Sequence, residues 1–159
     1  MTIHDFDMAR FFVPEIVEVS ARGANSFSDY IAEVGDYDSV NVVMRGANNE
    51  LITIVNSRHA SFGYDQRIEA FGSLGMLTAS NQLPTTVRSY TATQTEVADP
   101  YLNFFLERYM VAYKQELADF VSGIQNGKNT NPSYEDGRQA LILADAALES
   151  AKTGKSITL

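Results

Sequence analysis

Apolar residues near the N-terminus follow a helical spacing. Phe6, Ala9 and Val13 recur at intervals of three and four residues until a proline interrupts the pattern, as expected for one face of a short helix. Thr2 and Asp5 stand three residues apart at its start, which is the spacing of a capping box with Asp in place of the usual Glu. We therefore expect a short helix with a capped first turn.

The pattern then changes to short segments that predict β-strands. These segments are rich in β-branched and aromatic residues and are separated by clusters of Gly, Asn, Asp or Pro, which is typical of strands joined by turns. They cover residues 16–21, 40–45, 51–58, 66–71 and 87–91. The sequence Gly-Ala-Asn-Asn-Glu at 46–50 predicts a hairpin loop, so its flanking strands should pair antiparallel.

Several of these strands carry apolar residues on both alternating sets. In the strand at 40–45, Val42 and Met44 would face one side of the sheet and Val43 the other. In the strand at 51–58, Leu51 and Val55 would face the side opposite to the other apolar residues of that strand. A sheet with one wetted face shows a cleaner alternation. We therefore expect helices on one face and a second subunit over part of the other.

The last third returns to helical spacing. Asp99 followed by Pro100 predicts an N-cap and first turn, and the apolar stripe that follows runs to Asn126-Gly127, a C-terminal signal. The aromatic residues of this stripe are interpreted as core: Phe104, Tyr109, Tyr113 and Phe120.

A second helix should begin with a capping box formed by Ser133 and Asp136. Its expected stripe, which ends before Gly154, is Leu141, Ala144, Leu148 and Ala151. Residues 156–159 could form a short strand or a tail. Strands followed by helices, without βαβ alternation, predict an α+β fold: one domain over residues 1–159, with helices packed on one face of an open, largely antiparallel sheet.

Composition narrows the classes of function. The 159 residues carry a net charge of −8, which opposes binding to nucleic acid or to anionic membrane surfaces. The chain has no cysteine and only two histidines, so neither a disulfide framework nor an ordinary structural zinc site is expected. No apolar run is long enough to cross a membrane and no secretory signal is evident, so we expect a cytoplasmic protein.

One candidate for catalysis is the imidazole of the first helix. His4 and Asp7 are three residues apart, so they should share a helix face and could converge on one polar ligand. A neutral imidazole in this position is suited to take a proton from a hydroxyl group. The alternative is structural: Asp5 and Asp7 would complement the helix dipole, Asp7 would pair with Arg10, and His4 would be a surface or capping residue.

A second cluster lies in the segment 56–67, where a strand leads through a glycine-containing bend to another strand. Arg58, His59 and Tyr64 could bind a polyol through their guanidinium, imidazole and hydroxyl groups. The alternative is a hairpin in which Tyr64 packs at the rim and the arginines pair with Asp65 or Glu69.

The ordered set of motifs resembles the C-terminal domain of the glucose-fructose oxidoreductase and inositol dehydrogenase family, and inositol 2-dehydrogenases in particular. The motifs are T-I-H-D-F-D-M-A-R-F, E-I-V-E-V, G-Y-D-Q-R-I-E-A-F-G-S-L-G-M-L, Y-x-x-A-Y-x-x-E-L-x-x-F-V-x-x-I and D-G-R-Q-A-L-I-L-A-D-A-A-L-E-S. The resemblance implies an open mixed sheet with helices on one face. It also implies a catalytic role for His4 beside an upstream lysine, and contacts of Asp7 and Tyr64 with substrate hydroxyls.

The resemblance further implies an enzyme that oxidises a hydroxyl of a sugar or cyclitol with NAD or NADP, and that forms a homo-oligomer through the sheet face. The family's Rossmann domain, with its glycine-rich loop and lysine, has no counterpart in this sequence, and the family's aspartate four residues before the histidine would fall just before Met1. We therefore expect a substrate-binding and oligomerisation domain that binds no cofactor and is inactive alone. The alternative is a free-standing sugar- or cyclitol-binding or assembly module.

Overall fold

The computed structural model describes residues 1–129 and 131–159. These residues form two compact units, of which the first comprises Met1–His59 with Asn129–Leu159 and the second comprises Ala60–Lys128. Each unit is described by itself below. The expectation of one domain over residues 1–159 stays a prediction.

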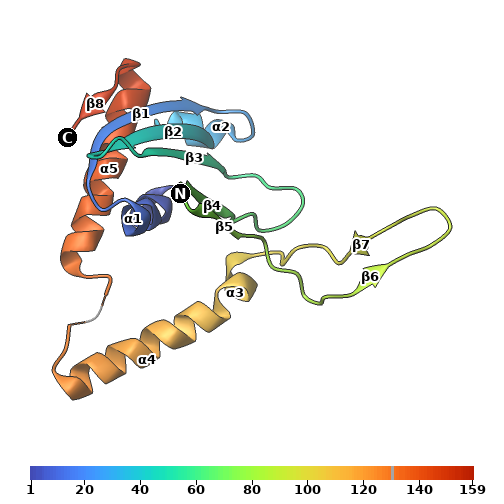
Figure 1. Ribbon diagram of the computed structural model, residues 1–159. Helices are drawn as coiled ribbons and strands as arrows, with labels where there is room; N and C mark the ends of the chain where they lie inside the picture. The colour runs from blue at the N-terminus through green and yellow to red at the C-terminus, as the bar shows by residue number, and fades with distance from the viewer. Residues whose placement is uncertain (130) are drawn as a thin grey trace. The chain divides into compact units, whose positions relative to one another are not determined.

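The first unit is a four-stranded sheet with helices on one face. Its strands are β1 (Ile16–Ala24), β2 (Ser39–Gly46), β3 (Leu51–Ser57) and β8 (Ile157–Thr158). They are ordered β3-β2-β1-β8, and each pairing is antiparallel (Figure 1). The expected hairpin between β2 and β3 and the strand in the C-terminal segment are both confirmed, as is the α+β fold class.

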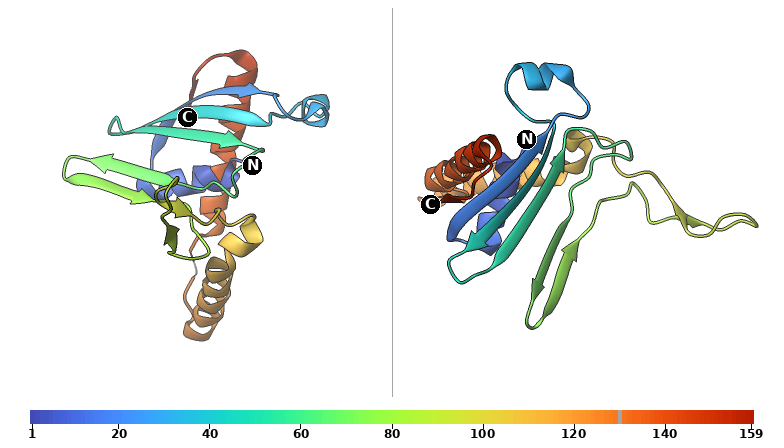
Figure 2. Two further views of the ribbon diagram at one scale, coloured as in Figure 1. Left: turned by 90° about the vertical axis from the view of Figure 1, so that its right-hand side faces the viewer. Right: turned by 90° about the horizontal axis from the view of Figure 1, so that it is seen from above.

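Three helices accompany this sheet: α1 (Ile3–Phe12), α2 (Asp29–Glu33) and α5 (Tyr134–Thr153). Helix α5 packs against β1, and α1 packs against α5, so both long helices lie on the same side of the sheet (Figure 2). The core between them is apolar, and the following of its residues are at most 3% exposed: Phe6, Val19, Val42, Met44, Ala140 and Leu143. This core fixes the position of α1 relative to the strands.

A β-bulge at the start of β1 explains why its burial does not alternate strictly. Ile16 pairs with Gly46 and Glu18 with Arg45, so β1 has one residue more than β2 in this interval. The extra residue allows both Ile16 and Val19 to face the core, because a bulge reverses the alternation of side chains beyond it.

The two predicted capping boxes have different outcomes. Ser133 and Asp136 form theirs: the Ser133 N–H donates to Asp136 Oδ2 over 2.7 Å, and the Asp136 N–H donates to Ser133 Oγ over 3.3 Å. The capping box of Thr2 and Asp5 is wrong. Thr2 has helical backbone angles (φ −78°, ψ −7°) and no side-chain cap bond, whereas a capping residue needs an extended backbone.

The expected stripe of α5 is correct at Ala144 and Ala151, which pack against the core, and wrong at its two leucines. Leu141 and Leu148 are 53% and 38% exposed, whereas the buried residues of the helix are Ala140, Leu143, Ala146, Ala147 and Ser150. Small side chains allow α5 to approach β1 closely. Ser150 Oγ accepts a hydrogen bond from the Ala21 N–H over 2.9 Å, and Ala21 lies beyond the residues of β1 that pair with β8. A buried serine therefore satisfies a strand N–H that would otherwise lack a partner.

The second unit contains two hairpins and two helices. The hairpins are formed by β4 (Ile68–Gly72) with β5 (Gly75–Ala79) and by β6 (Arg88–Ser89) with β7 (Val97–Ala98). The helices are α3 (Phe105–Arg108) and α4 (Met110–Asn126). Strand β5 was not predicted, and the strand expected at 87–91 has only two residues.

The expected start of the long helix is wrong, whereas its end is correct. Asp99 follows β7 and accepts a hydrogen bond from the Thr85 hydroxyl instead of capping a helix. Helix α4 ends at Gly127, whose φ of 61° lies in the left-handed region that favours glycine. The expected aromatic core is also wrong, because Phe104, Tyr113 and Phe120 are 42–52% exposed.

Candidate active site

The imidazole and the carboxylate predicted to act together lie near the N-terminus of α1. His4 is exposed and Asp7 is half-buried, while Phe6 and Ala9 on the other side of the helix are in the core. Their spacing of three residues places His4 and Asp7 on one helix face. Burial of Phe6 thus orients α1 so that the imidazole is accessible. The catalytic role of His4 and the substrate contact of Asp7 stay predictions.

Arg10 pairs with a residue of α5 instead of with Asp7, the partner that the structural alternative expected. The Arg10 guanidinium donates to the carboxylate of Asp136, with 3.3 Å between Arg10 Nη1 and Asp136 Oδ1, and also to the Asp136 carbonyl. Asp136 belongs to the first turn of α5, so Arg10 joins the two helices. The ion pair with Arg10 that the structural alternative assigned to Asp7 is therefore formed by Asp136.

Asp5 occupies a position between the core and the predicted site. Burial raises the pKa of its carboxyl above the ordinary value, although a hydrogen bond from the Asn56 side chain and the charge of His4 both act to lower it. Asn56 lies in β3, which is the edge strand of the sheet order. Neither the contact nor its partner was predicted, because residues 5 and 56 come together only through the packing of α1 on the sheet.

Tyr64 belongs to the second unit, where its surroundings fix it. The Tyr64 N–H donates to the Leu102 carbonyl over 2.9 Å, and its ring meets the edge of the Tyr109 ring with 5.7 Å between centroids. The Tyr109 hydroxyl in turn donates to Gln66 Oε1. The backbone of Tyr64 is thus bonded to residue 102, and its ring packs against Tyr109, which Gln66 in turn binds.

Gly63 is required beside Tyr64 for two reasons. Its φ of 117° lies outside the range of ordinary L-residues, and a Cβ atom there would stand 3.0 Å from Tyr101 Cβ and 3.1 Å from the Leu102 carbonyl oxygen. A larger residue would push this segment away from residues 101–102. The position of Tyr64 therefore depends on the glycine that precedes it.

The remaining residues of the second sequence cluster have structural partners. Arg67 and Asp65 form the ion pair expected by the structural alternative, with 2.7 Å between Arg67 Nε and Asp65 Oδ1. The pair holds the pKa of Asp65 below its ordinary value. His59 lies in the first unit, where it stacks on Phe27 with 5.1 Å between ring centroids. A common polyol site for Arg58, His59 and Tyr64 stays a prediction.

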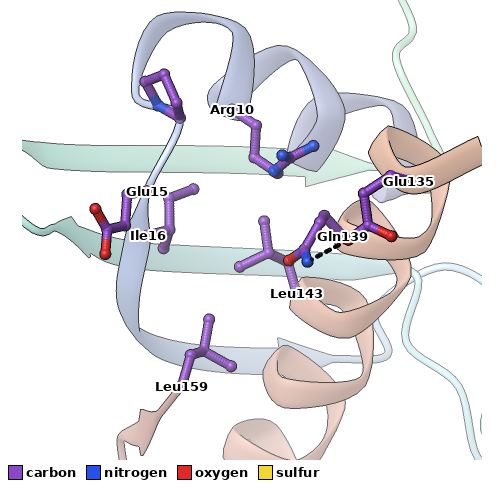
Figure 3. A pocket seen from close by; sticks show the side chains of 8 residues that line it. Arg10, Glu15, Ile16, Glu135, Gln139, Leu143 and Leu159 are labelled. Carbon is purple, nitrogen blue, oxygen red and sulfur yellow. Dashed lines mark hydrogen bonds between the residues drawn. The ribbon is translucent and has the colours of Figure 1, made fainter. Parts of the chain in front are cut away.

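The first unit has a hollow of about 290 Å³, and His4 and Asp7 are not among the residues that line it (Figure 3). It is lined by residues from the end of α1, the start of β1, the first turns of α5 and the C-terminal end: Arg10, Pro14, Glu15, Ile16, Glu135, Gln139, Leu143 and Leu159. Arg10 pairs with Asp136, and hydrogen bonds from Arg138 and Gln139 lower the pKa of Glu135 to about 2. Arg10 and Glu135 thus serve contacts within the protein.

Asp38 is a buried carboxylate that sequence reasoning missed. Its side chain is 0% exposed and accepts hydrogen bonds from the N–H groups of Ser26, Phe27 and Ser28 and from the Ser39 hydroxyl, over 2.7–3.1 Å. Burial alone would raise its pKa, but these donors outweigh burial and lower it. Nothing in the local sequence distinguishes Asp38 from the exposed Asp36, since only the folded loop gathers the donors.

The N-termini of α1 and α5 do not fit the diphosphate of a dinucleotide. Such groups bind where a glycine-rich turn leaves the N–H groups of a helix N-terminus free. The first turns of α1 and α5 instead carry their own carboxylates, and the Ser133–Asp136 capping box satisfies N–H groups at the second. Within residues 1–129 and 131–159, no helix could cross a membrane and no three His, Asp or Glu side chains could together hold a metal ion.

Comparison with known proteins shows which class of protein this chain resembles. Residues 1–78 match the sequence model of the GFO/IDH/MocA C-terminal domain. This stretch contains α1, the three long strands of the sheet and the segment of Tyr64. The resemblance stated from the sequence motifs is thereby confirmed, because residues 1–78 are similar to the C-terminal domain of these oxidoreductases.

The particular proteins that the whole chain resembles are inositol dehydrogenases. The chain is 43% identical to inositol 2-dehydrogenase of Rhizobium meliloti over 160 aligned positions, which are 100% of this chain and 48% of that protein. The crystal structure of a myo-inositol dehydrogenase from Corynebacterium glutamicum is 65% identical, with a TM-score of 0.95 over 100% of this chain and 48% of the other.

A second solved structure has ligands bound. Scyllo-inositol dehydrogenase from Lactobacillus casei, with bound NAD(H) and scyllo-inositol, is 27% identical with a TM-score of 0.88 over 99% of this chain and 46% of the other. The chain therefore spans about half the length of the proteins that it matches.

Proposed function

We propose that this chain is the substrate-binding and oligomerisation part of an NAD(P)-dependent dehydrogenase that oxidises a hydroxyl group of a cyclitol such as inositol. The observation that carries the proposal is the accessible His4 on α1, held beside Asp7 in a domain that matches inositol dehydrogenases along its whole length. A relative with scyllo-inositol and NAD(H) bound supports this class of substrate.

In this proposal His4 accepts the proton that leaves the substrate hydroxyl group. Oxidation of an alcohol to a ketone requires removal of the hydroxyl proton, and a neutral imidazole is a suitable acceptor near neutral pH. Asp7, on the same helix face, accepts a hydrogen bond from a second hydroxyl and so orients the ring. Tyr64, whose phenol both donates and accepts, contacts a further hydroxyl.

The nicotinamide cofactor, NAD or NADP, is held in this proposal by a part of the parent protein outside the present chain. The acidic first turns of α1 and α5 support this division, because they disfavour a diphosphate. The alternative function, a free-standing cyclitol-binding module, would be supported by saturable binding of inositol to the chain in the absence of nucleotide.

The proposed function is tested by His4→Ala in the full-length parent. Turnover of inositol with NAD should fall about 100-fold or more, as expected when a general base is lost. Thr2→Ala is the matched control, because Thr2 lies two residues before His4 and makes no side-chain cap bond, and it should keep turnover within about twofold. Unchanged turnover of the His4→Ala enzyme would remove His4 from the reaction and contradict the proposal.

A further inference from the structure

The backbone and the ring of Tyr64 have partners, whereas no group within residues 1–129 and 131–159 hydrogen-bonds to its hydroxyl. The Tyr64 N–H donates to the Leu102 carbonyl over 2.9 Å, and its half-buried side chain lies against Tyr109. A backbone hydrogen bond does not select the rotamer of a side chain. The ring contact is therefore the one that bears on where the Tyr64 hydroxyl lies.

Tyr109 contacts two residues of the segment that contains Tyr64. Its ring is perpendicular to that of Tyr64, with 83° between the ring planes and 5.7 Å between the centroids, which is a favoured arrangement of aromatic rings. Its hydroxyl donates to Gln66 Oε1. Gln66 is in turn anchored by its backbone N–H, which donates to Asn81 Oδ1 over 2.7 Å. One side chain thus binds this segment through an aromatic contact and through a directional hydrogen bond.

Tyr109 itself lies at the junction of α3 and α4. Its N–H donates to the Phe105 carbonyl over 2.9 Å, and its carbonyl accepts from the Tyr113 N–H over 2.9 Å. The guanidinium carbon of Arg108 lies 5.4 Å from the centroid of its ring. Because Tyr109 is attached through its backbone on both sides as well as through its ring, it is a suitable support for the segment of Tyr64.

We propose that Tyr109 is a positioning residue of the substrate site, whose ring sets the orientation of Tyr64 and so places the Tyr64 hydroxyl for a hydrogen bond to the substrate. This inference rests on the proposed function, because it gives Tyr109 a task only if Tyr64 contacts the substrate. Tyr109 acts through Tyr64 and does not bind the substrate itself. Since two hydroxyl oxygens must come within about 3 Å to form a hydrogen bond, a rotated Tyr64 ring would lose the contact.

The first test measures the ring contact in the present chain by NMR of ¹³C-labelled tyrosine side chains. Nuclear Overhauser effects should connect the ring protons of Tyr64 and Tyr109. The Tyr64 ring signals should shift in Tyr109→Leu, which removes the neighbouring ring, and should stay near their native positions in Tyr109→Phe, which keeps it. Tyr90→Leu is the matched control, because Tyr90 is 63% exposed in the same unit. Absence of the effects between Tyr64 and Tyr109 in the native chain would overturn the proposal.

The second test is a double-mutant cycle in the full-length parent. Tyr64→Phe removes the hydroxyl and should raise the KM for inositol about 10-fold, as expected for one lost hydrogen bond. Its kcat should change less than about twofold, because a contact away from the reacting carbon contributes to binding rather than to chemistry. Tyr109→Leu should raise KM by a similar factor, and Tyr90→Leu should leave KM unchanged.

The double variant distinguishes positioning from a general loss of stability. In Tyr64→Phe, Tyr109→Leu the KM should rise little beyond that of either single variant, because both substitutions remove the same contact with the substrate. A KM raised by the product of the two single factors would mean that Tyr109 acts independently of Tyr64, and would overturn the proposal. Should Tyr109→Leu fail to fold, Tyr109→Met, with its adaptable side chain, takes its place in the cycle, and an unchanged KM in that variant would overturn the proposal.

The outcomes separate this inference from the proposed function. If Tyr64→Phe raises KM while Tyr109→Leu keeps the KM of the parent, Tyr109 has no positioning role and the proposed function stands. If Tyr64→Phe leaves KM unchanged, the inference is wrong, whereas the loss of turnover in His4→Ala would still support the proposed reaction. If His4→Ala keeps full turnover, the proposed function is wrong and the role of Tyr109 falls with it.

Discussion

At the scale of single residues, the molecule uses buried or half-buried carboxylates in two different ways. Asp38 is fully covered and surrounded by donors, so its pKa is lowered and it is held as an anion. Asp5 has fewer hydrogen-bond donors around it than Asp38, so the effect of burial dominates and the pKa of Asp5 is raised. The number of hydrogen-bond donors within reach decides between these results. The first arrangement suits a structural anchor and the second suits a group that must respond to a neighbouring imidazole.

The lowered pKa of Asp38 predicts how stability depends on pH. A carboxyl with a lower pKa in the folded state stabilises the protein above its ordinary pKa of 3.8, and this contribution is lost as the pH falls through the folded value. The urea midpoint should therefore decrease between about pH 4 and pH 2 more steeply in the native chain than in Asp38→Asn. Asp36→Asn is the control, since among the described residues the exposed Asp36 carboxylate accepts only from the adjacent Tyr37 N–H. Parallel curves for the native chain and Asp38→Asn would contradict the prediction.

At the scale of elements, α5 has a strongly defined start. The Ser133 hydroxyl and the Asp136 carboxylate satisfy each other's backbone N–H groups, and Asp136 also receives the Arg10 guanidinium from α1. The beginning of α5 is therefore connected both to its own backbone and to the helix that carries His4. Loss of the cap should be felt as a loss of stability of the whole first unit.

Ser133→Ala should lower the free energy of unfolding by about 1 kcal/mol, the usual effect of removing an N-cap side chain. Urea denaturation followed by circular dichroism measures this change. Ser28→Ala provides a matched control, because Ser28 occupies the N-cap position of α2 without a side-chain cap bond. A loss in Ser28→Ala as large as that in Ser133→Ala would show that capping is not the cause.

Comparison of these elements with the sequence shows which features were predictable. The hairpin of β2 and β3, the cap of α5 and the glycine that ends α4 depend on neighbouring residues, and each was predicted. The start of the long helix was not, because Asp99 is bound by Thr85 of a preceding segment. The stripe of α5 was displaced in part because Leu143, alanines and Ser150 face the sheet, whereas Leu141 and Leu148 are exposed.

The features of the candidate site likewise divide into those that the sequence predicted and those that only the tertiary fold brings about. His4 and Asp7 could be grouped from their spacing alone, since both belong to one helix. The link from Asp5 to Asn56 joins residues 51 positions apart in different elements, and no periodicity indicates it. The support of Tyr64 by Tyr109 and Gln66 is likewise a product of the tertiary fold.

At the scale of the whole molecule, the outer face of the sheet of the first unit carries three exposed apolar side chains. Val43, Leu51 and Val55 are 49%, 78% and 72% exposed, and they alternate with the residues that α1 and α5 cover. Three such side chains on adjacent strands favour association with another surface. We expect a second copy of the chain to cover them, in line with the oligomerisation role proposed above.

Light scattering at tens of micromolar should therefore give the mass of a dimer or a larger oligomer. The double variant Val43→Lys, Val55→Lys should have the mass of a monomer, because burying two unpaired ammonium groups is unfavourable. Leu141→Lys, at an exposed position of α5, adds charge on a different element and should leave the mass unchanged. A monomeric native chain would contradict the predicted oligomer.

The extra residue in β1 has a practical consequence for recombination between relatives. A hybrid protein that exchanges segments within residues 16–19 must keep the bulge, since a junction that removes one position would turn Ile16 from the core to the opposite face. Alignments used to choose crossover points should therefore allow neither an insertion nor a deletion at this bulge, although the side chain of the extra residue is free to vary.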